Sequence, residues 1–246
     1  MFDLSWNKLT WDGTYNWEAG GEEWSVAWGG SEAQWFGCIY PRIHRFLPAD
    51  RVLEIAPGFG RWTKFLLPAT KIEYLGIDIS EECVNRCRDI FRDVDKASFY
   101  ANDGLSLHMV PDGMFDFVFS FDSLVHAEID VLEAYIPQIL KKLRPNGVAF
   151  IHHSNWLAAG ERGENPHCRA VSVSAEAVAK LVQESGGLVL IQEVLNWGML
   201  SCIDCFSVFR QAESHFRTVI GIIHNPRFMD ETSIICQTQS PYSRIH

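Results

Sequence analysis

Short apolar runs recur along the chain from residue 51 and are separated by longer segments with helical spacing. The runs at 51–56, 72–78, 97–101, 115–120 and 147–153 predict buried strands. The segments at 60–68, 80–92 and 127–143 predict helices, and Ser80 followed by two glutamates is typical of a helix start. Strands that alternate with helices form a parallel sheet with right-handed crossovers. The pattern therefore predicts a doubly wound α/β fold.

The spacing becomes less regular after residue 153. A loop rich in Gly, Asn, Glu and Pro runs to about residue 172, and a helix is predicted at 174–184. Two further strand-like runs follow at 188–195 and 202–209, which brings the expected sheet to seven strands. Residues 211–246 show no readable pattern.

The first 47 residues differ in composition from the rest. They hold six of the nine tryptophans, with glycines between them. Aromatic residues at this density bury area when they dock, so we expect an ordered segment. Two interpretations stay open: a cap fixed on the sheet, or a lid whose indole rings, Trp24 and Trp28 among them, bind a substrate. Residues 34–46 show helical spacing that Pro48 closes. We therefore expect a cap or lid segment at 1–47 and one domain at 48–246.

A glycine-containing turn follows the first predicted strand. Gly58 and Gly60 interrupt the apolar pattern, and a turn without Cβ atoms lets a ligand approach the backbone. Asp78 ends the second strand, 18 residues past Gly60. Nucleotide-binding α/β units place an acid at this point to accept hydrogen bonds from ribose hydroxyls.

The stretch Leu53-Glu54-Ile55-Ala56-Pro57-Gly58-Phe59-Gly60, followed by Gly76-Ile77-Asp78, resembles the first two motifs of class I S-adenosylmethionine-dependent methyltransferases. The resemblance covers roughly residues 50–155, with Pro57 as a small departure. It implies S-adenosylmethionine as cofactor and a Rossmann-like seven-stranded sheet whose last strand is antiparallel. It also implies a set of cofactor-binding residues: Glu54, Ala56, Gly58, Gly60, Asp78, Ile79, Asp103, Gly104, Ser120 and Phe121.

Candidate catalytic residues follow the fourth and fifth strands. Ligands bind at the carboxyl ends of strands in open α/β sheets, which is where Asp122, His126, His152 and His153 are expected. A hydroxyl that accepts a methyl group must lose its proton, and histidine can take it near neutral pH. We rank His153 first as the base, ahead of His126 and His152. A divalent metal held by Asp122, His152 and His153 is the less favoured alternative, so no metal is expected.

The acceptor is expected to be a small molecule. The aromatic N-terminal segment, the His-His-Ser-Asn run at 152–155 and the Trp197-Gly198 turn resemble bacterial methyltransferases of sugars and secondary metabolites. This looser resemblance favours a hydroxyl of a sugar, glycan or natural product as the acceptor. Asn155, His167 and Arg169 in the long loop are candidate substrate ligands. Methylation of nitrogen or carbon stays open. An NAD-dependent oxidoreductase is less favoured, because Thr63 stands where a third glycine is needed. An inactive scaffold is disfavoured by the intact motifs.

Composition narrows the partners and the compartment. A net charge of −10 disfavours nucleic acid as the main ligand. No apolar run reaches the roughly 18 residues of a membrane span, and the N-terminus is too polar for a signal peptide. The seven cysteines are then expected to be reduced, in a cytoplasmic protein. Homo-oligomer formation stays open.

Overall fold

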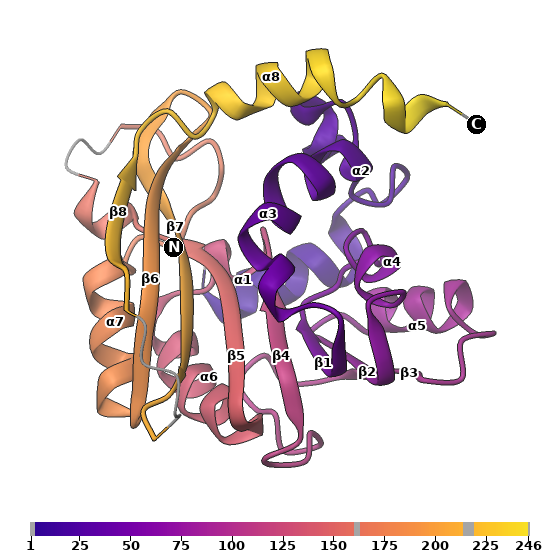
Figure 1. Cartoon of the computed structure of the whole chain (residues 1–246), viewed down its shortest axis with the longest axis vertical. Helices are drawn as coiled ribbons and strands as arrows, with labels where there is room; N and C mark the ends of the chain where they lie inside the picture. The colour runs from indigo at the N-terminus through magenta and orange to yellow at the C-terminus, as the bar shows by residue number, and fades with distance from the viewer. Residues whose placement is uncertain (1–2, 160–162, 214–218, 246) are drawn as a thin grey trace.

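The computed structural model describes residues 3–159, 163–213 and 219–245. A mixed eight-stranded sheet forms its centre, with strand order β3-β2-β1-β4-β5-β7-β6-β8 (Figure 1). The strands are β1 (Ala49–Ile55), β2 (Thr70–Asp78), β3 (Ala97–Ala101), β4 (Phe115–Ser120), β5 (Leu143–Ser154), β6 (Gly187–Trp197), β7 (Leu200–Gln211) and β8 (Gly221–Asn225). The α/β fold class predicted from the sequence is confirmed.

Pairing within the sheet is parallel from β3 to β5, and β7 is antiparallel to both β5 and β6. Seven strands coincide with predicted runs. The eighth, β8, pairs in parallel with β6 and lies in the part of the chain that showed no pattern. Its residues are half-buried or exposed, so the strand carries none of the apolar alternation that marks a buried one.

Successive residues of a strand point to opposite sides of the sheet, and here both sides carry apolar side chains. Helices therefore pack against both faces. Val52 and Phe119 face a core that includes Trp35 of the N-terminal segment, whereas Leu53 and Val118 face the core under α6 and α7. The helices are α1 (Leu4–Leu9), α2 (Ser31–Gln34), α3 (Tyr40–Ile43), α4 (Thr63–Leu66), α5 (Glu81–Ile90), α6 (Ile129–Lys142), α7 (Ala175–Glu184) and α8 (Asp230–Thr238).

The N-terminal segment has two parts with different surroundings. Residues 31–46 are helical almost throughout, and Trp35, Ile39 and Ile43 are buried in the core. Residues 3–28 contain short helical segments, at Leu4–Leu9, Thr10–Thr14 and Glu22–Trp28. The C-terminal helix α8 packs beside α2 (Figure 1), and the hydroxyl of Ser240 donates to the carbonyl of Gly29 at 3.0 Å.

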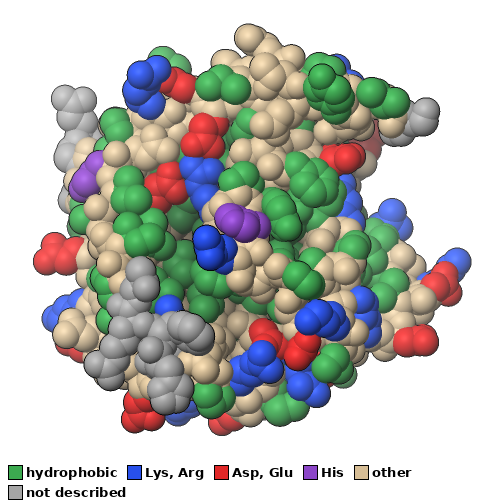
Figure 2. All heavy atoms as spheres, viewed as in Figure 1, with side chains coloured by type: hydrophobic (Ala, Val, Ile, Leu, Met, Phe, Trp, Pro, Cys, Tyr) green, Lys and Arg blue, Asp and Glu red, His purple; other side chains and the backbone are tan. Residues whose placement is uncertain are grey.

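Charges of both signs are interspersed on the face of the molecule in Figure 2. Within the described residues, every helix is too short or too polar to cross a lipid bilayer.

Candidate functional site

A cavity opens at the carboxyl ends of β1, β2 and β4. It contains about 910 Å³ of empty space, part of it open to solvent. The strand ends and the loops that follow them form its floor. Residues 4–24 of the N-terminal segment form its roof.

The loop after β1 forms the centre of the floor, and its backbone is exposed to the cavity. Gly58 and Gly60 adopt left-handed conformations with φ of 57° and 83°, as does Ala56 at 58°. A Cβ on Gly58 would lie 3.1 Å from the ring of Trp17 in the roof, and one on Gly60 would lie 2.7 Å from Phe91. Ala56 and Gly58 line the cavity, whereas Gly60 lies beneath it and permits the turn.

Asp78 lies at the end of β2 on the cavity wall. Its carboxylate accepts hydrogen bonds from the backbone N–H of Gly58 and of Ser80, each at 2.9 Å, and so ties the two loops together. Burial raises the pKa of Asp78 to about 6, against the lowering effect of these amides. Asp12 of the roof adds to the rise, because its carboxylate lies nearby and accepts from the Ser80 hydroxyl at 2.9 Å.

Glu54 does not line the cavity. It is buried, and its carboxylate accepts from the hydroxyls of Thr63, at 2.7 Å, and Tyr74. Burial raises the pKa of Glu54 to about 7. Glu54 therefore stabilises α4 and the loop after β1, and it does not contact the cavity.

The remaining predicted cofactor residues divide between the cavity and its surroundings. Ile79, Gly104 and Phe121 line the cavity. Ser120 is fully buried and lies outside the lining. Asp103 is exposed, and its carboxylate accepts from the N–H of Leu105 and of Ser106 within its own turn. The structure therefore places Asp103, like Ser120 and Glu54, outside the cavity lining.

Three indole rings from the N-terminal segment form the roof: Trp11, Trp17 and Trp24. Their centroids lie 5.6–6.1 Å apart, and Trp17 stacks on Phe59 of the floor at 4.6 Å. Trp28, also predicted to bind substrate, is buried beside Trp197 and lies outside the cavity. The segment is thus a roof at residues 4–24 and a packed cap further along.

His126 lines the cavity beneath this roof. Its Nδ1 lies 2.8 Å from the carbonyl oxygen of Cys168. A carbonyl only accepts, so Nδ1 carries the proton and Nε2 keeps a lone pair. Burial, with Arg169 nearby, lowers the pKa of His126 to about 4. The ring is therefore neutral at physiological pH, with an acceptor nitrogen available.

Arg61 and Asp122 form a buried ion pair in the cavity floor, with Nη2 and Oδ2 2.9 Å apart. The Arg61 guanidinium lies over the rings of Trp24 and Trp62, and so connects floor and roof. Burial opposes ionisation of Asp122, but Arg61 and Arg169 outweigh it and hold its pKa below the ordinary value. The sequence analysis named Asp122 and missed Arg61. A charged residue directly after the glycine turn was the available signal.

His152 and His153 point to opposite faces of β5, as neighbouring strand residues must. Neither lines the cavity, and both are fully buried. His153, ranked first as the base, lies 2.7 Å from the Ser207 hydroxyl and 2.8 Å from the Ser154 carbonyl. The structure thus places His153 away from the expected pocket. His153 is thereby also separated from Asp122 and His152, the two residues with which it was considered as a metal site. The described residues contain no cluster of three or more His, Cys, Asp or Glu suited to a metal.

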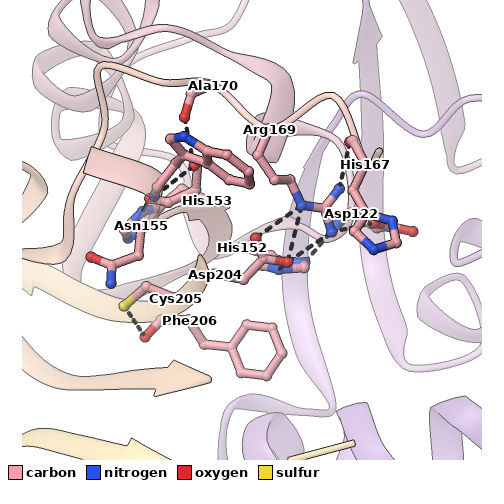
Figure 3. A network of polar contacts seen from close by, with 12 residues as sticks. Asp122, His152, His153, Asn155, His167, Arg169, Ala170, Asp204, Cys205 and Phe206 are labelled. Atoms are coloured by element: carbon pink, nitrogen blue, oxygen red, sulfur yellow. Dashed lines mark hydrogen bonds and ion pairs between the residues drawn. The ribbon is translucent and has the colours of Figure 1, made fainter. Parts of the chain in front are cut away.

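The three loop residues predicted to bind substrate also lie outside the cavity lining. Asn155 is buried and bonds to the backbone of Cys202 and Ala175. His167 is half-buried beside Gly198. Arg169 binds the carboxylate of Asp204 with contacts of 2.7–3.2 Å (Figure 3). Asp204 was not predicted, although a single acid within the apolar run of β7 indicates a buried partner.

The chain is similar to a known family and to curated proteins over part of its length. Residues 52–147 match a family model described as a methyltransferase domain. A phosphoethanolamine N-methyltransferase of Plasmodium falciparum is 28% identical over 102 residues, which is 42% of this chain and 38% of that protein. A 2-methyl-6-phytyl-1,4-hydroquinone methyltransferase of Synechocystis is 25% identical over 130 residues, 53% of this chain and 38% of that protein. The chain thus spans less than half the length of these relatives.

Solved structures show the same fold over a larger part of the chain. An S-adenosylmethionine-dependent methyltransferase of Clostridium acetobutylicum is 16% identical, with a TM-score of 0.57 over 73% of this chain and 91% of that one. A second, of Mesorhizobium loti, is 17% identical, with a TM-score of 0.55 over 73% of this chain and 98% of that one. At such identities the likeness concerns the fold alone.

Proposed function

Because the chain contains a class I S-adenosylmethionine-dependent methyltransferase domain, we propose that the protein transfers a methyl group from S-adenosylmethionine to a hydroxyl of a sugar, glycan or small natural product. The cofactor and the acceptor would share the cavity at the strand ends. Both would lie under the indole roof formed by Trp11, Trp17 and Trp24.

The residues of the cavity fit the cofactor. The bare backbone at Gly58 permits close approach, since a side chain there would crowd the roof. The Asp78 carboxylate has lone pairs beyond those used by its two backbone donors and would accept from the ribose hydroxyls. Leu4, Ile79 and Gly104 offer an apolar wall for adenine. When bound, S-adenosylmethionine supplies an electrophilic methyl group on sulfur.

His126 would take the proton that the acceptor hydroxyl loses. Its ring is neutral at physiological pH, and the Cys168 carbonyl fixes the tautomer that leaves Nε2 as the acceptor. This role passes to His126 from His153, because His153 is enclosed on the other face of β5. The roof covers one side of the cavity and would limit the access of water to the methyl group.

The observation that carries the proposal is the presence of Asp78, the Gly58 backbone and a neutral His126 in one cavity. The test is incubation with methyl-labelled S-adenosylmethionine and a panel of sugars, phenols and alcohols. We expect label in an O-methyl product of at least one member. Failure across the panel by a protein that binds S-adenosylhomocysteine would overturn the hydroxyl acceptor.

An amine acceptor is the second candidate. Indole faces attract ammonium groups, and three of them line this cavity. The N-methyltransferase among the relatives supports the same chemistry, and a neutral His126 could equally take a proton from an ammonium. Amines in the same panel would separate the two candidates, because an N-methyl product would favour the amine.

A further inference from the structure

The backbone of Asp122 has a conformation that requires an explanation. Its φ is 60°, in the left-handed region that few residues other than glycine adopt. The residue lines the cavity floor, where this conformation directs the carboxylate to Arg61. The surrounding structure must therefore hold it in place.

His152 holds the backbone of Asp122 through one ring nitrogen. The N–H of Asp122 donates to Nδ1 of His152 at 3.2 Å, so Nδ1 cannot carry a proton. Nε2 lies 3.1 Å from the carboxylate of Asp204, which only accepts, so Nε2 must carry the proton. The two bonds together allow a single neutral tautomer. The ring packs between Phe121 and Phe206, with centroids 4.9 and 4.8 Å away.

Asp204 is kept ionised beneath this ring, since Arg169 grips both of its carboxylate oxygens. The side chains of Asp204, Arg169 and His152 are all at most 3% exposed. Figure 3 shows the three side chains close together, beside Asp122. Arg169 also lies 3.8 Å from the Asp122 carboxylate. The four side chains form a closed network that reaches the cavity only at Asp122.

We propose that Asp204 is a positioning residue that fixes the tautomer of His152 and, through it, the left-handed backbone of Asp122 in the cavity floor. An asparagine at 204 offers an amide that can donate to Nε2. The ring proton would then move to Nδ1, which could no longer accept from the N–H of Asp122. Asp122 would leave its present conformation, and its contact with Arg61 would change.

The effect on the reaction rests on the proposed function, whereas the effect on the ring does not. In Asp204→Asn we expect the imidazole ¹⁵N spectrum to show His152 protonated at Nδ1 and the backbone amide resonance of Asp122 to shift. Affinity for S-adenosylhomocysteine should stay within about twofold, because the cradle at Gly58 and Asp78 is untouched. The rate of methyl transfer should fall by about 10–100-fold through misplacement in the floor.

Two further variants make the test decisive. Asp204→Asn leaves Arg169 without its partner and could unfold the protein, so Asp204→Asn combined with Arg169→Gln removes the unpaired charge and should show the same tautomer change. Ser207→Ala is the matched control, since it removes the partner of the neighbouring His153 and should leave the Asp122 resonance in place. A folded variant at 204 with unchanged His152 and Asp122 signals would overturn the proposal. So would an equal shift in Ser207→Ala.

Discussion

At the scale of single residues, Asp78 connects the two loops that we propose as the cofactor cradle. One carboxylate oxygen accepts from the Gly58 N–H and the other from the Ser80 N–H. The same carboxylate would accept from the cofactor ribose. Structural and binding roles would therefore coincide in one side chain, and both would depend on its charge.

Replacement of Asp78 by asparagine should weaken cofactor affinity. Hydrogen bonds to a charged acceptor contribute roughly 1.5–3 kcal/mol, which corresponds to at least about tenfold in affinity. The measurement is calorimetric titration with S-adenosylhomocysteine. Asp103→Asn is the control, because Asp103 is exposed and its carboxylate bonds within its own turn. The affinity of this variant for S-adenosylhomocysteine should be unchanged. Equal losses in both variants would contradict the placement of the cradle.

Cofactor affinity should also depend on pH through Asp78. Its pKa is raised to about 6 by burial, so the ionised acceptor is present above pH 6 and is lost as pH falls through that value. At pH 5 the affinity for S-adenosylhomocysteine should be about tenfold weaker than at pH 8. The same titration on Asp78→Asn should show little dependence on pH. A flat wild-type profile would mean that Asp78 does not receive the ribose in its charged form.

His126→Gln should lower the turnover rate by about 10²–10⁴-fold with little change in cofactor affinity, as expected on loss of a general base. A histidine base with the ordinary pKa would lose activity below about pH 6. The lowered pKa of His126, about 4, moves that fall to lower pH when cofactor is saturating. His153→Gln serves as comparison and should keep near-normal turnover if it folds. Normal turnover in His126→Gln would remove the histidine from the mechanism.

Residue roles were predictable from the sequence where a motif fixes them and not where partners are distant. Gly58 and Asp78 follow strand ends with a known spacing, and both line the cavity. The chain order did not reveal that His152 and His153 would face apart toward Asp204 and Ser207, 52 and 54 residues away. Strand alternation indicated only that one of the two could face the pocket.

At the scale of elements, residues 4–24 form the roof of the proposed cofactor cavity and contribute Trp11, Trp17 and Trp24 to its lining. Asp12 attaches this segment to α5, where its carboxylate accepts from the Ser80 hydroxyl at 2.9 Å and from the Glu82 N–H at 3.2 Å. An acid at a helix N-terminus is favourable, because the orphan N–H groups and the helix dipole attract it. We therefore expect Asp12 to hold the roof closed.

Asp12→Ala should loosen the roof. Limited proteolysis within residues 3–28 should be faster in the variant, and bound S-adenosylhomocysteine should protect the wild type more than the variant. Glu18→Ala, an exposed acid on the same segment, should digest like the wild type. Digestion indifferent to both ligand and variant would mean that the segment is fixed packing and not a lid.

Elements were predictable where burial imposes a period. Strands β1 to β7 each contain a run that faces a core, and all seven were predicted. The helix expected at 60–68 contracts to Thr63–Leu66, because the left-handed turn at Gly60 delays its start. Strand β8 is exposed on one edge of the sheet, and its residues carry no hydrophobic pattern.

At the scale of the whole molecule, Arg42 joins three distant parts of the chain. Arg42 lies in α3, which follows the roof in sequence. Its guanidinium contacts Glu193 of β6 at 2.7 Å and Glu231 of α8 at 2.8 Å. The partners lie 151 and 189 residues away in sequence, so no local pattern could indicate them. The guanidinium also lies over the Phe228 ring at 5.1 Å.

Arg42→Met should lower the free energy of unfolding by about 1–3 kcal/mol, because it leaves two partly buried carboxylates without their partner. The value is smaller than for a fully buried pair, since these side chains keep 15–30% of their exposure. Urea denaturation measures it. Lys180→Met, in an exposed pair with Glu184, should change stability by less than about 0.5 kcal/mol. Comparable effects of the two substitutions would mean that Arg42 does not anchor α8.

The central claim is that the cavity under the indole roof binds the methyl donor, and direct calorimetric titration with S-adenosylhomocysteine tests it. We expect one molecule to bind per chain and to change tryptophan fluorescence, since Trp11, Trp17 and Trp24 line the cavity. A parallel titration with NAD should give no binding. Binding of NAD in place of S-adenosylhomocysteine, or of neither, would contradict the account.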